Sequence, residues 1–309
     1  MVFEGSEKKI EIVVSSSIGD LRDRGREYWE KIVSKCNAEI ISEVRNDKMI
    51  AYLLSESSLF VWKNSILMIT CGKTSLVNSL VEFVRDFGVL NIENVIFQRK
   101  NEYYSHLQIS NFYDDLELLK SYLDGRAWRL GELDGHHNFI FYYEKSGSEF
   151  PNDKTLELLM YNINNAIGEK LRSENLNVSN IRETLGLNKI FHDYEIDDFL
   201  FSPFGYSVNG VKGDRYFTIH LTPEQDGSYV SFETNDDQYN QNELVEHFIK
   251  TLGPKSFDTI CFNISQLNQI KNHTLINKCD HEISGKLNVS FAQHINNPVA
   301  KMTTSYQLL

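Results

Sequence analysis

Alternating hydrophobic and polar residues recur along most of this chain, in short runs that end at glycine, asparagine or aspartate. Runs of this kind, rich in Ile, Val, Phe, Tyr and Thr, are typical of β-strands. We predict strands at residues 9–15, 48–54, 59–63, 66–70, 95–99, 128–133, 138–144, 155–162, 216–222, 228–234, 257–264, 286–292 and 301–307. Strands therefore dominate both halves of the sequence.

Five segments instead space their apolar residues three and four positions apart, as an amphipathic helix does. The predicted helices are 21–36, 75–87, 114–123, 179–185 and 242–252. A few helices among many strands, without strict alternation of the two, favour an α+β fold built in layers. The stretch 145–153, with Gly147, Pro151 and Asn152, is the candidate seam between halves 1–150 and 151–309 of one domain.

Composition narrows the classes of function. The chain has 309 residues, 41% of them hydrophobic, and a formal net charge of -12. This charge argues against nucleic acid, whose phosphates need a basic surface, and suits a cationic small molecule. No apolar run is long enough to span a membrane, no apolar signal segment begins the chain, and the four cysteines lack metal-site spacing. We expect a reduced, cytoplasmic protein without a metal.

The segment Leu54-Ser55-Glu56-Ser57-Ser58-Leu59-Phe60-Val61 places two hydroxyls behind a carboxylate, between apolar runs. Alone, this segment is more typical of a turn. Its company changes that interpretation, because five further motifs follow one order: Phe3-Glu4-Gly5-Ser6-Glu7-Lys8, Thr70-Cys71-Gly72, Phe201-x-Pro203-x-Gly205-Tyr206-Ser207-x-Asn209-Gly210, Thr218-Ile219-His220-Leu221-Thr222-Pro223-Glu224 and Tyr229-Val230-Ser231-Phe232-Glu233-Thr234. Together they resemble the eukaryotic S-adenosylmethionine decarboxylases. The residues after 234 carry no motif that we can match.

The resemblance implies a fold, an activity and a cofactor. The family fold is a four-layer αββα sandwich of two similar halves. The implied enzyme converts S-adenosylmethionine to its decarboxylated form, the aminopropyl donor of spermidine and spermine biosynthesis, and CO2. It would be a proenzyme that cuts itself between Glu56 and Ser57, giving a β chain 1–56 and an α chain 57–309. Ser57 would become a pyruvoyl group that holds the substrate as a Schiff base.

Self-cleavage needs a strained peptide, a stabiliser for the oxyanion and a base. In the strand at 216–222, period-two geometry puts His220 on a face with Thr218 and Tyr216. An isolated histidine in a strand is more often a structural or surface residue than a catalytic one. The motif around His220 makes the catalytic role the favoured interpretation. By resemblance His220 is the base, and Ser207, in a predicted turn, holds the processing intermediate. By default Cys71 is a buried small side chain; by resemblance it protonates the substrate carbon.

The resemblance also implies residues that bind the substrate. Phe3 and Phe201 would sandwich the adenine, because aromatic faces stack on one another. Glu224 would accept hydrogen bonds from the ribose hydroxyls. Leu54 and Glu56 would contact the substrate, and Glu4 and Glu7 would support processing and orientation.

A second acidic set alternates along strands, which usually indicates a solvated face. By resemblance to the animal enzymes it instead lines a buried site for putrescine, an activator: Glu11, Asp153, Thr155, Glu157 and Glu233. One departure matters here. Ile69 stands where we expect a lysine of the same charge network. Either a diamine compensates for that lost charge, or the network is rewired.

Two other functions compete with this interpretation. The chain could be a catalytically weak paralogue that acts as a regulatory partner of an active decarboxylase, or a non-enzymatic nucleoside-binding protein. The presence of Ser57, Cys71, Ser207 and His220 disfavours the first and is left unexplained by the second. A homodimer of αβ units is a further expectation. The adjacent His136 and His137, in a turn bounded by glycine and asparagine, are expected to be exposed.

Overall fold

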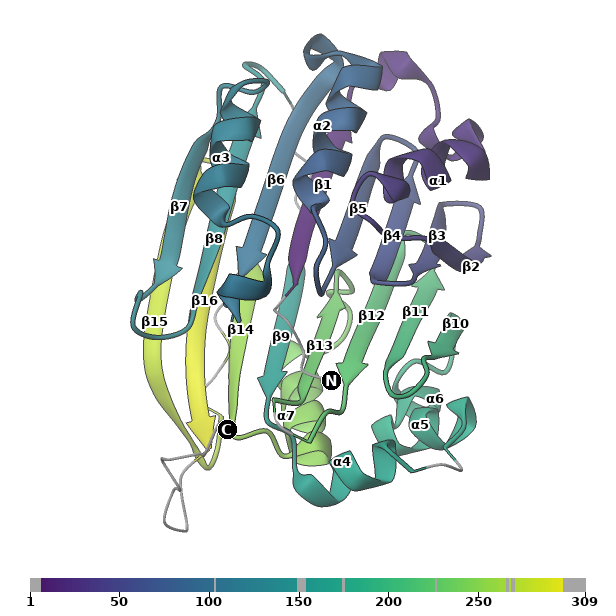
Figure 1. Cartoon of the computed structure of the whole chain (residues 1–309), viewed down its shortest axis with the longest axis vertical. Coiled ribbons are helices and arrows are strands. Elements are labelled where there is room, and N and C mark those ends of the chain that lie inside the picture. Colours follow the sequence, from purple (N-terminus) through teal and green to yellow (C-terminus); the bar gives the residue numbers. More distant parts are fainter. Residues whose placement is uncertain are drawn as a thin grey trace.

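The computed structural model describes residues 7–102, 104–148, 154–173, 176–225, 227–264, 267 and 270–296. Its strands form two antiparallel sheets of eight strands each (Figure 1). Sheet A contains β1 (Lys8–Val14), β2 (Ile40–Arg45), β3 (Met49–Leu54), β4 (Ser57–Trp62), β5 (Ser65–Thr70), β6 (Ile92–Lys100), β7 (Arg126–Gly131) and β8 (His137–Glu144). Sheet B contains β9 (Thr155–Tyr161), β10 (Glu195–Leu200), β11 (Tyr206–Lys212), β12 (Arg215–Thr222), β13 (Tyr229–Thr234), β14 (Ser256–Phe262), β15 (His273–Ser284) and β16 (Leu287–Asn296).

The two sheets have the same internal order. Sheet A runs β2-β3-β4-β5-β1-β6-β8-β7, and sheet B runs β10-β11-β12-β13-β9-β14-β16-β15. Each strand of sheet B therefore takes the place of the strand numbered eight lower in sheet A. The prediction of an α+β fold with two similar halves is confirmed.

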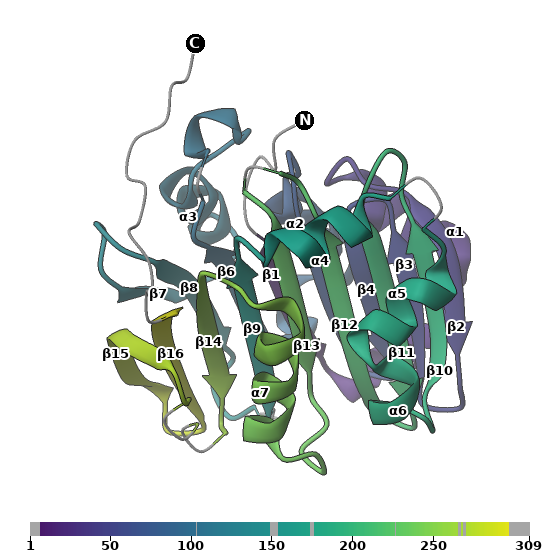
Figure 2. The ribbon, with the colours of Figure 1, turned by 90° about the horizontal axis from the view of Figure 1, so that it is seen from below.

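Helices cover the outer face of each sheet. Sheet A packs against α1 (Arg26–Ser34), α2 (Leu76–Phe87) and α3 (Phe112–Lys120). Sheet B packs against α4 (Asn165–Leu171), α5 (Val178–Leu185), α6 (Leu187–Ile190) and α7 (Gln241–Leu252), which lie in front of it in Figure 2. The order of layers is αββα, as expected. No helix in the described residues is long and apolar enough to cross a membrane.

Four strands were not predicted from the sequence, because none of them shows a simple alternation of hydrophobic and polar residues. β2, β10 and β15 lie at sheet edges, where polar and charged residues are common, and β11 carries Ser207, Asn209 and Gly210 among its apolar residues. The helix predicted at 21–36 is split by Gly25, whose φ of 78° ends a 3-10 turn before α1. The strand predicted at 301–307 lies outside the described residues.

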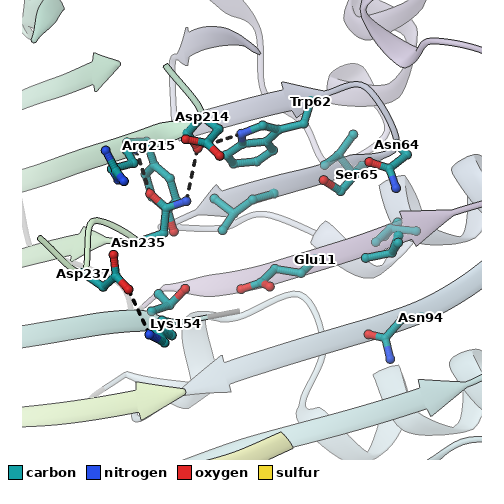
Figure 3. A pocket seen from close by; sticks show the side chains of 16 residues that line it. Glu11, Trp62, Asn64, Ser65, Asn94, Lys154, Asp214, Arg215, Asn235 and Asp237 are labelled. Atoms are coloured by element: carbon teal, nitrogen blue, oxygen red, sulfur yellow. Dashed lines mark hydrogen bonds and ion pairs between the residues drawn. The ribbon is translucent and has the colours of Figure 1, made fainter. Parts of the chain in front are cut away.

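The layer between the sheets is not uniformly apolar. Along β1, Ile10 and Ile12 face the helices of sheet A, so Lys9 and Glu11 face sheet B. Two apolar clusters fill the inter-sheet layer, one around Phe60, Ile69 and Tyr216 and the other around β6, β8, β14 and β16. Charged side chains occupy the space along β1 and β9. A pocket of about 510 Å³ opens beside Glu11 at one end of this space (Figure 3).

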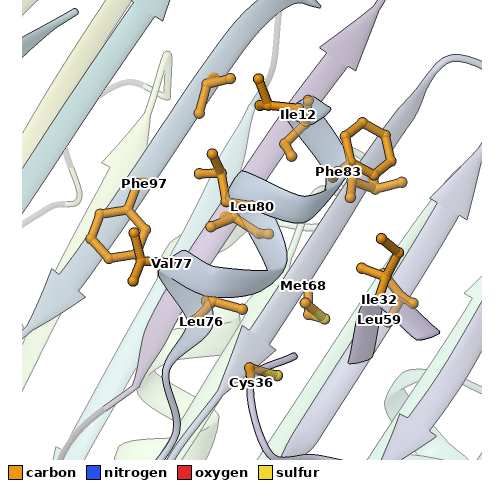
Figure 4. Packing of buried hydrophobic residues seen from close by; sticks show 14 of the residues in the cluster. Ile12, Ile32, Cys36, Leu59, Met68, Leu76, Val77, Leu80, Phe83 and Phe97 are labelled. Atoms are coloured by element: carbon orange, nitrogen blue, oxygen red, sulfur yellow. The ribbon is translucent and has the colours of Figure 1, made fainter. Parts of the chain in front are cut away.

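Helix α2 shows how the outer layers are held. Ser75 precedes its first residue, and Leu76, Leu80 and Phe83 are fully buried on its inner face. Figure 4 shows these side chains together with Ile12, Met68 and Phe97 of sheet A, which belong to the same buried cluster. Burying a side chain of this size stabilises the fold by about 1.5–3 kcal/mol. Apolar packing of this kind fixes the sheets as a frame for the polar groups between them.

The expectation that His136 is exposed is wrong. Its side chain, in the turn between β7 and β8, is only 13% exposed, and Nδ1 lies 2.9 Å from both carboxylate oxygens of buried Asp258 on β14. The Tyr161 hydroxyl donates to the same carboxylate at 3.0 Å. Burial raises the pKa of Asp258, and the hydrogen bond from His136 opposes that rise. The pair therefore links the two sheets, which the sequence separation of these residues concealed.

We expect His136→Ala to lower the free energy of unfolding by about 3 kcal/mol, because it leaves a buried carboxylate without its imidazole partner. Replacing both partners, with His136→Ala and Asp258→Val together, should cost less than His136→Ala alone. Urea unfolding measures both values. His137→Ala is the matched control, with an expected change within about 0.5 kcal/mol. Equal losses in the single and double variants would show that the pair does not carry this energy.

Candidate active site

The hairpin between β3 and β4 concentrates backbone strain at one residue. Its loop is Ser55-Glu56, and Leu54 pairs with Ser57 across the two strands. Two-residue hairpin loops usually take their positive φ inside the loop. Here the positive φ, 145°, falls on Ser57, whereas the other described non-glycine residues with positive φ are asparagines at 48–65°. A serine held in this conformation stores about 1–3 kcal/mol of strain.

The carbonyl group that precedes Ser57 is held by Cys71, the residue that follows β5. The Glu56 carbonyl oxygen accepts from the Cys71 backbone N–H at 2.9 Å and from its thiol Sγ at 3.3 Å. Ser57 Oγ is buried and has no hydrogen-bond partner among the residues that the structure describes. Burial, reinforced by the charges of Glu56 and Glu7, raises the pKa of Cys71 well above its usual value. Cys71 is therefore a neutral thiol that can donate to this carbonyl.

His220 and Ser207 lie side by side on neighbouring strands of sheet B. Ser207 pairs with His220 in the β11–β12 ladder, and Ser207 Oγ is 3.0 Å from His220 Nδ1. The predicted turn at Ser207 is thus wrong, because Ser207 is the second residue of β11. The other ring nitrogen, Nε2, lies 2.9 Å from Thr218 Oγ1 and 3.3 Å from Ser58 Oγ. Ser58, not Ser57, makes the direct contact with this histidine.

Asn209 fixes the tautomer of His220. Its Oδ1 accepts the Ser58 hydroxyl at 2.6 Å and the Thr218 hydroxyl at 3.0 Å, and its Nδ2 donates to the Tyr52 carbonyl at 3.1 Å. Both hydroxyl hydrogens are thereby committed, so His220 Nε2 must donate and carry the ring proton. Nδ1 is left as the basic nitrogen, and it faces the Ser207 hydroxyl. Burial lowers the pKa of His220 to about 4, so the ring is neutral near pH 7.

Asn209, Thr218 and Ser58 were not assigned a role from the sequence, although all three lie in the motifs that carry the resemblance. A signal was available. Asn209 is two residues from Ser207, and Thr218 is two residues from His220, so period two places each pair on one face of a strand.

The residues expected to bind substrate are only partly described. Phe3 and Glu4 lie outside the described residues. Phe201 and Glu224 follow β10 and β12, beyond the end of sheet B that carries Ser207. The ring of Phe201 packs edge-to-face against the ring of Phe199, with 4.9 Å between the ring centroids. The backbone N–H of Phe201 donates to the Gly205 carbonyl at 2.8 Å. Gly205 has a φ of 136°, which favours glycine there.

A chain of buried charges crosses the middle of the sandwich. Lys9 Nζ lies 2.6 Å from Glu11, 2.9 Å from Glu157 and 2.8 Å from Glu233. Glu157 also pairs with Lys100 at 3.0 Å, and Lys100 pairs with Glu7 at 3.0 Å. Glu7 in turn accepts a hydrogen bond from Ser231, the strand partner of His220. The charges therefore lead from the pocket in Figure 3, where Glu11 is labelled, to β13, the strand next to the one that carries His220.

Glu11, Glu157 and Glu233 come together around the amine of Lys9. They lie between the two sheets, not on a solvated face. Lys9 is the direct strand partner of Ile69 in the β1–β5 ladder. The positive charge expected at position 69 thus enters from the neighbouring strand, and Ile69 joins an apolar cluster instead. Of the rest of the expected set, Thr155 lines the pocket and Asp153 lies outside the described residues.

The carboxylates do not share the two lysines equally. Burial raises the pKa of Glu233 to about 7, although Lys9 opposes that rise. Burial acts on Glu157 in the same direction, but Lys100 and Lys9 outweigh it and lower the pKa of that carboxyl. The cluster can therefore hold a proton on Glu233 near neutral pH while Glu157 stays ionised between the two amines.

Comparison with known proteins gives one consistent family. A family model described as adenosylmethionine decarboxylase matches residues 1–308. Proteins named S-adenosylmethionine decarboxylase proenzyme are similar to this chain: that of Xenopus laevis is 33% identical over 94% of this chain and 91% of the relative, and that of Drosophila melanogaster is 32% identical over 94% and 88%. The solved structure of the Trypanosoma brucei AdoMetDC-delta26 monomer has a TM-score of 0.60 at 23% identity, covering 77% of this chain and 98% of that one.

Proposed function

The chain belongs to the adenosylmethionine decarboxylase family, and we propose that it is a proenzyme that cuts its own Glu56–Ser57 bond and then decarboxylates S-adenosylmethionine, a step of polyamine biosynthesis. One observation carries the assignment of residues. The carbonyl before the strained Ser57 is held by the N–H and thiol of Cys71. The alternative of a catalytically weak paralogue is not favoured, because all four side chains that the chemistry needs are present.

Cleavage begins with attack of Ser57 Oγ on the Glu56 carbonyl carbon. The carbonyl oxygen gains negative charge, which the Cys71 N–H and thiol stabilise. The Glu56–Ser57 C–N bond then breaks, the Ser57 nitrogen takes up a proton, and an ester joins the Glu56 carbonyl carbon to Ser57 Oγ. Relief of the positive φ at Ser57 favours this shift.

The ester is broken by elimination rather than by water. A base removes the Cα proton of Ser57, the Cβ–O bond breaks, and Glu56 leaves as a carboxylate. Neutral His220 is the proposed base, with the hydroxyl of Ser207 hydrogen-bonded to its basic Nδ1. The dehydroalanine that remains at position 57 becomes an imine, and water converts this to a pyruvoyl group and ammonia.

The described residues fit that group, since position 57 is a buried serine at a strained junction. A pyruvoyl carbonyl binds the substrate amine and accepts the electrons of the breaking C–CO2 bond. Cys71 is proposed to protonate the substrate carbon, a role that suits a thiol kept protonated by burial. The residues proposed to bind substrate are Phe3, Leu54, Glu56, Phe201 and Glu224. Glu4 and Glu7 are proposed to support processing and the orientation of the substrate. A homodimer of αβ units stays a prediction.

Cleavage tests the proposal directly. Wild-type protein should show two masses under denaturing conditions, one for residues 1–56 and one for an α chain blocked at its first residue. Ser57→Ala should remain one chain and have no decarboxylase activity. Ser58→Ala is the control for the neighbouring hydroxyl: cleavage should stay at the same bond and slow about tenfold, because one hydrogen bond to Asn209 is lost. A wild-type chain that stays whole on prolonged incubation would rule the proposal out.

His220 and Cys71 should separate the two stages. His220→Ala should stop at the ester, so that hydroxylamine releases both chains, whereas Cys71→Ala should still process, more slowly, and lose turnover. In the wild type, the processing rate should be flat above about pH 5 and fall as pH drops through about 4, where His220 gains a proton and ceases to be a base. Time courses of chain cleavage measure both effects. Normal turnover by Cys71→Ala would remove the cysteine from its role.

Lys9 bears on the expected activation by putrescine, because it lies in the acidic cluster that would bind the diamine. The amine of Lys9 already contacts Glu11, Glu157 and Glu233. We therefore propose that Lys9 supplies the charge that a diamine would otherwise bring, and that this chain processes and turns over without putrescine. Unpaired buried carboxylates would recruit a cation or take up protons, but these carboxylates are paired.

Lys9→Met should make the chain respond to the diamine. Without the amine, the free energy of unfolding should fall by about 3 kcal/mol, which lowers the melting temperature. Millimolar putrescine should restore part of the lost melting temperature, because it binds the native state. The wild type should shift little under the same conditions. Lys154→Met, which removes an exposed lysine on the rim of the same pocket, controls for net charge. A marked putrescine response of the wild type, in melting temperature or processing rate, would instead support the diamine hypothesis.

A further inference from the structure

Lys8, the first residue of β1, is buried next to the candidate active site and has no part in the functions given above. The residue is 1% exposed, and Nζ donates to the Gly72 carbonyl at 3.1 Å and to the Gln108 side-chain oxygen at 2.7 Å. In sheet A it stands between Thr70 of β5 and Arg99 of β6. A lysine is rarely buried without a carboxylate partner, so its position calls for an explanation.

The first of these hydrogen bonds anchors the loop that carries Cys71. The Gly72 carbonyl accepts from Lys8, and the Cys71 carbonyl accepts from Thr74 Oγ1 at 3.2 Å. Gly72 itself has a φ of 63°, which turns the chain sharply after β5. Lys8 and Thr74 thus hold two successive carbonyl groups of this turn, and the turn sets where the Cys71 thiol points.

The charges around Cys71 are otherwise unfavourable to a thiolate. Glu56 and Glu7 both raise the pKa of the thiol, while Lys8 lowers it. Arg99, also near Lys8, is engaged elsewhere: it pairs with Asp115 at 2.6 Å and with Glu102 at 2.5 Å. Among the described residues, Lys8 Nζ makes no ion pair with a carboxylate. Burial and the charge of Arg99 lower the pKa of Lys8 to about 8, with Glu102, Cys71 and Asp115 opposing.

We infer that Lys8 is a positioning residue for Cys71: it anchors the Cys71–Gly72 turn and supplies the positive charge that stabilises the sulfur once Cys71 has given up its proton. This rests on the proposed role of Cys71 as proton donor. In that step the S–H bond breaks, the proton goes to the substrate carbon and the electron pair stays on sulfur. Lys8 keeps its own proton throughout, and the thiolate later regains a proton from water.

The experiment measures the thiolate itself rather than turnover. Iodoacetamide reacts with the thiolate form, so at fixed pH below the thiol pKa the rate of Cys71 alkylation follows the thiolate fraction. The uncut Ser57→Ala chain is used throughout, which keeps the readout independent of cofactor formation. Peptide mass spectrometry follows Cys71, with part-exposed Cys279 as the internal reference in the same sample.

Loss of the charge should slow Cys71 alkylation about tenfold or more, since one nearby opposite charge shifts a pKa by about one unit or more. We expect this for Lys8→Gln, which keeps a donor for Gly72, and for Lys8→Met, which keeps neither donor nor charge. Lys8→Arg should stay within about threefold of the parent, because it retains the positive charge. Lys73→Met, an exposed lysine two residues from Cys71, is the matched control and should change little.

The inference is overturned if Lys8→Gln alkylates at the parent rate, which would leave Lys8 a structural anchor only, or if Lys73→Met slows the reaction equally. A Lys8→Met chain that fails to fold does not affect the comparison of Lys8→Gln with Lys8→Arg. Failure of the proposed function is seen elsewhere, in processed Cys71→Ala protein that turns over normally, and that result leaves the alkylation outcome intact.

Discussion

Two sheets packed face to face exclude water, so every charged group placed between them must find a partner inside the protein. The chain of Lys9, Glu157, Lys100 and Glu7 meets this constraint. It lies between two apolar clusters and ties β1 and β6 of sheet A to β9 of sheet B. Because its last carboxylate is hydrogen-bonded to Ser231, beside His220, the same interactions that allow the sheets to close also set the charge near the candidate active site.

The candidate site belongs to neither half alone. Sheet A supplies the strained hairpin and Cys71, and sheet B supplies Ser207, Asn209 and His220. Asn209 joins them across the inter-sheet space, because its side chain accepts from the Ser58 hydroxyl and donates to the Tyr52 carbonyl. Although the two sheets share one strand order, they contribute different chemistry. The shared strand order thus gives the frame, while the reactive groups depend on how one sheet faces the other.

Within that frame, neighbouring residues have separate tasks. Ser57 carries the positive φ and an Oγ with no described partner, whereas Ser58 is fully hydrogen-bonded and helps fix the tautomer of His220. A hydroxyl engaged in such a network is held in place, and one without a partner is free to attack. Two identical side chains in sequence are made different by their positions at the start of a strand.

The sequence alone determined most strands, the α+β class and, through its motifs, the family. Period-two alternation also indicated correctly that Thr218 and His220 share a face. What alternation cannot tell is what covers that face. The acidic residues of β1 and β9 alternate as they would on a solvated face, yet they lie between the sheets. His136 was expected to be exposed and pairs with Asp258. Lys9 supplies the charge expected at Ile69 because the two residues are partners across a ladder. Each of these outcomes depends on contacts between residues far apart in the chain, and only the packing of one sheet on the other brings those residues together.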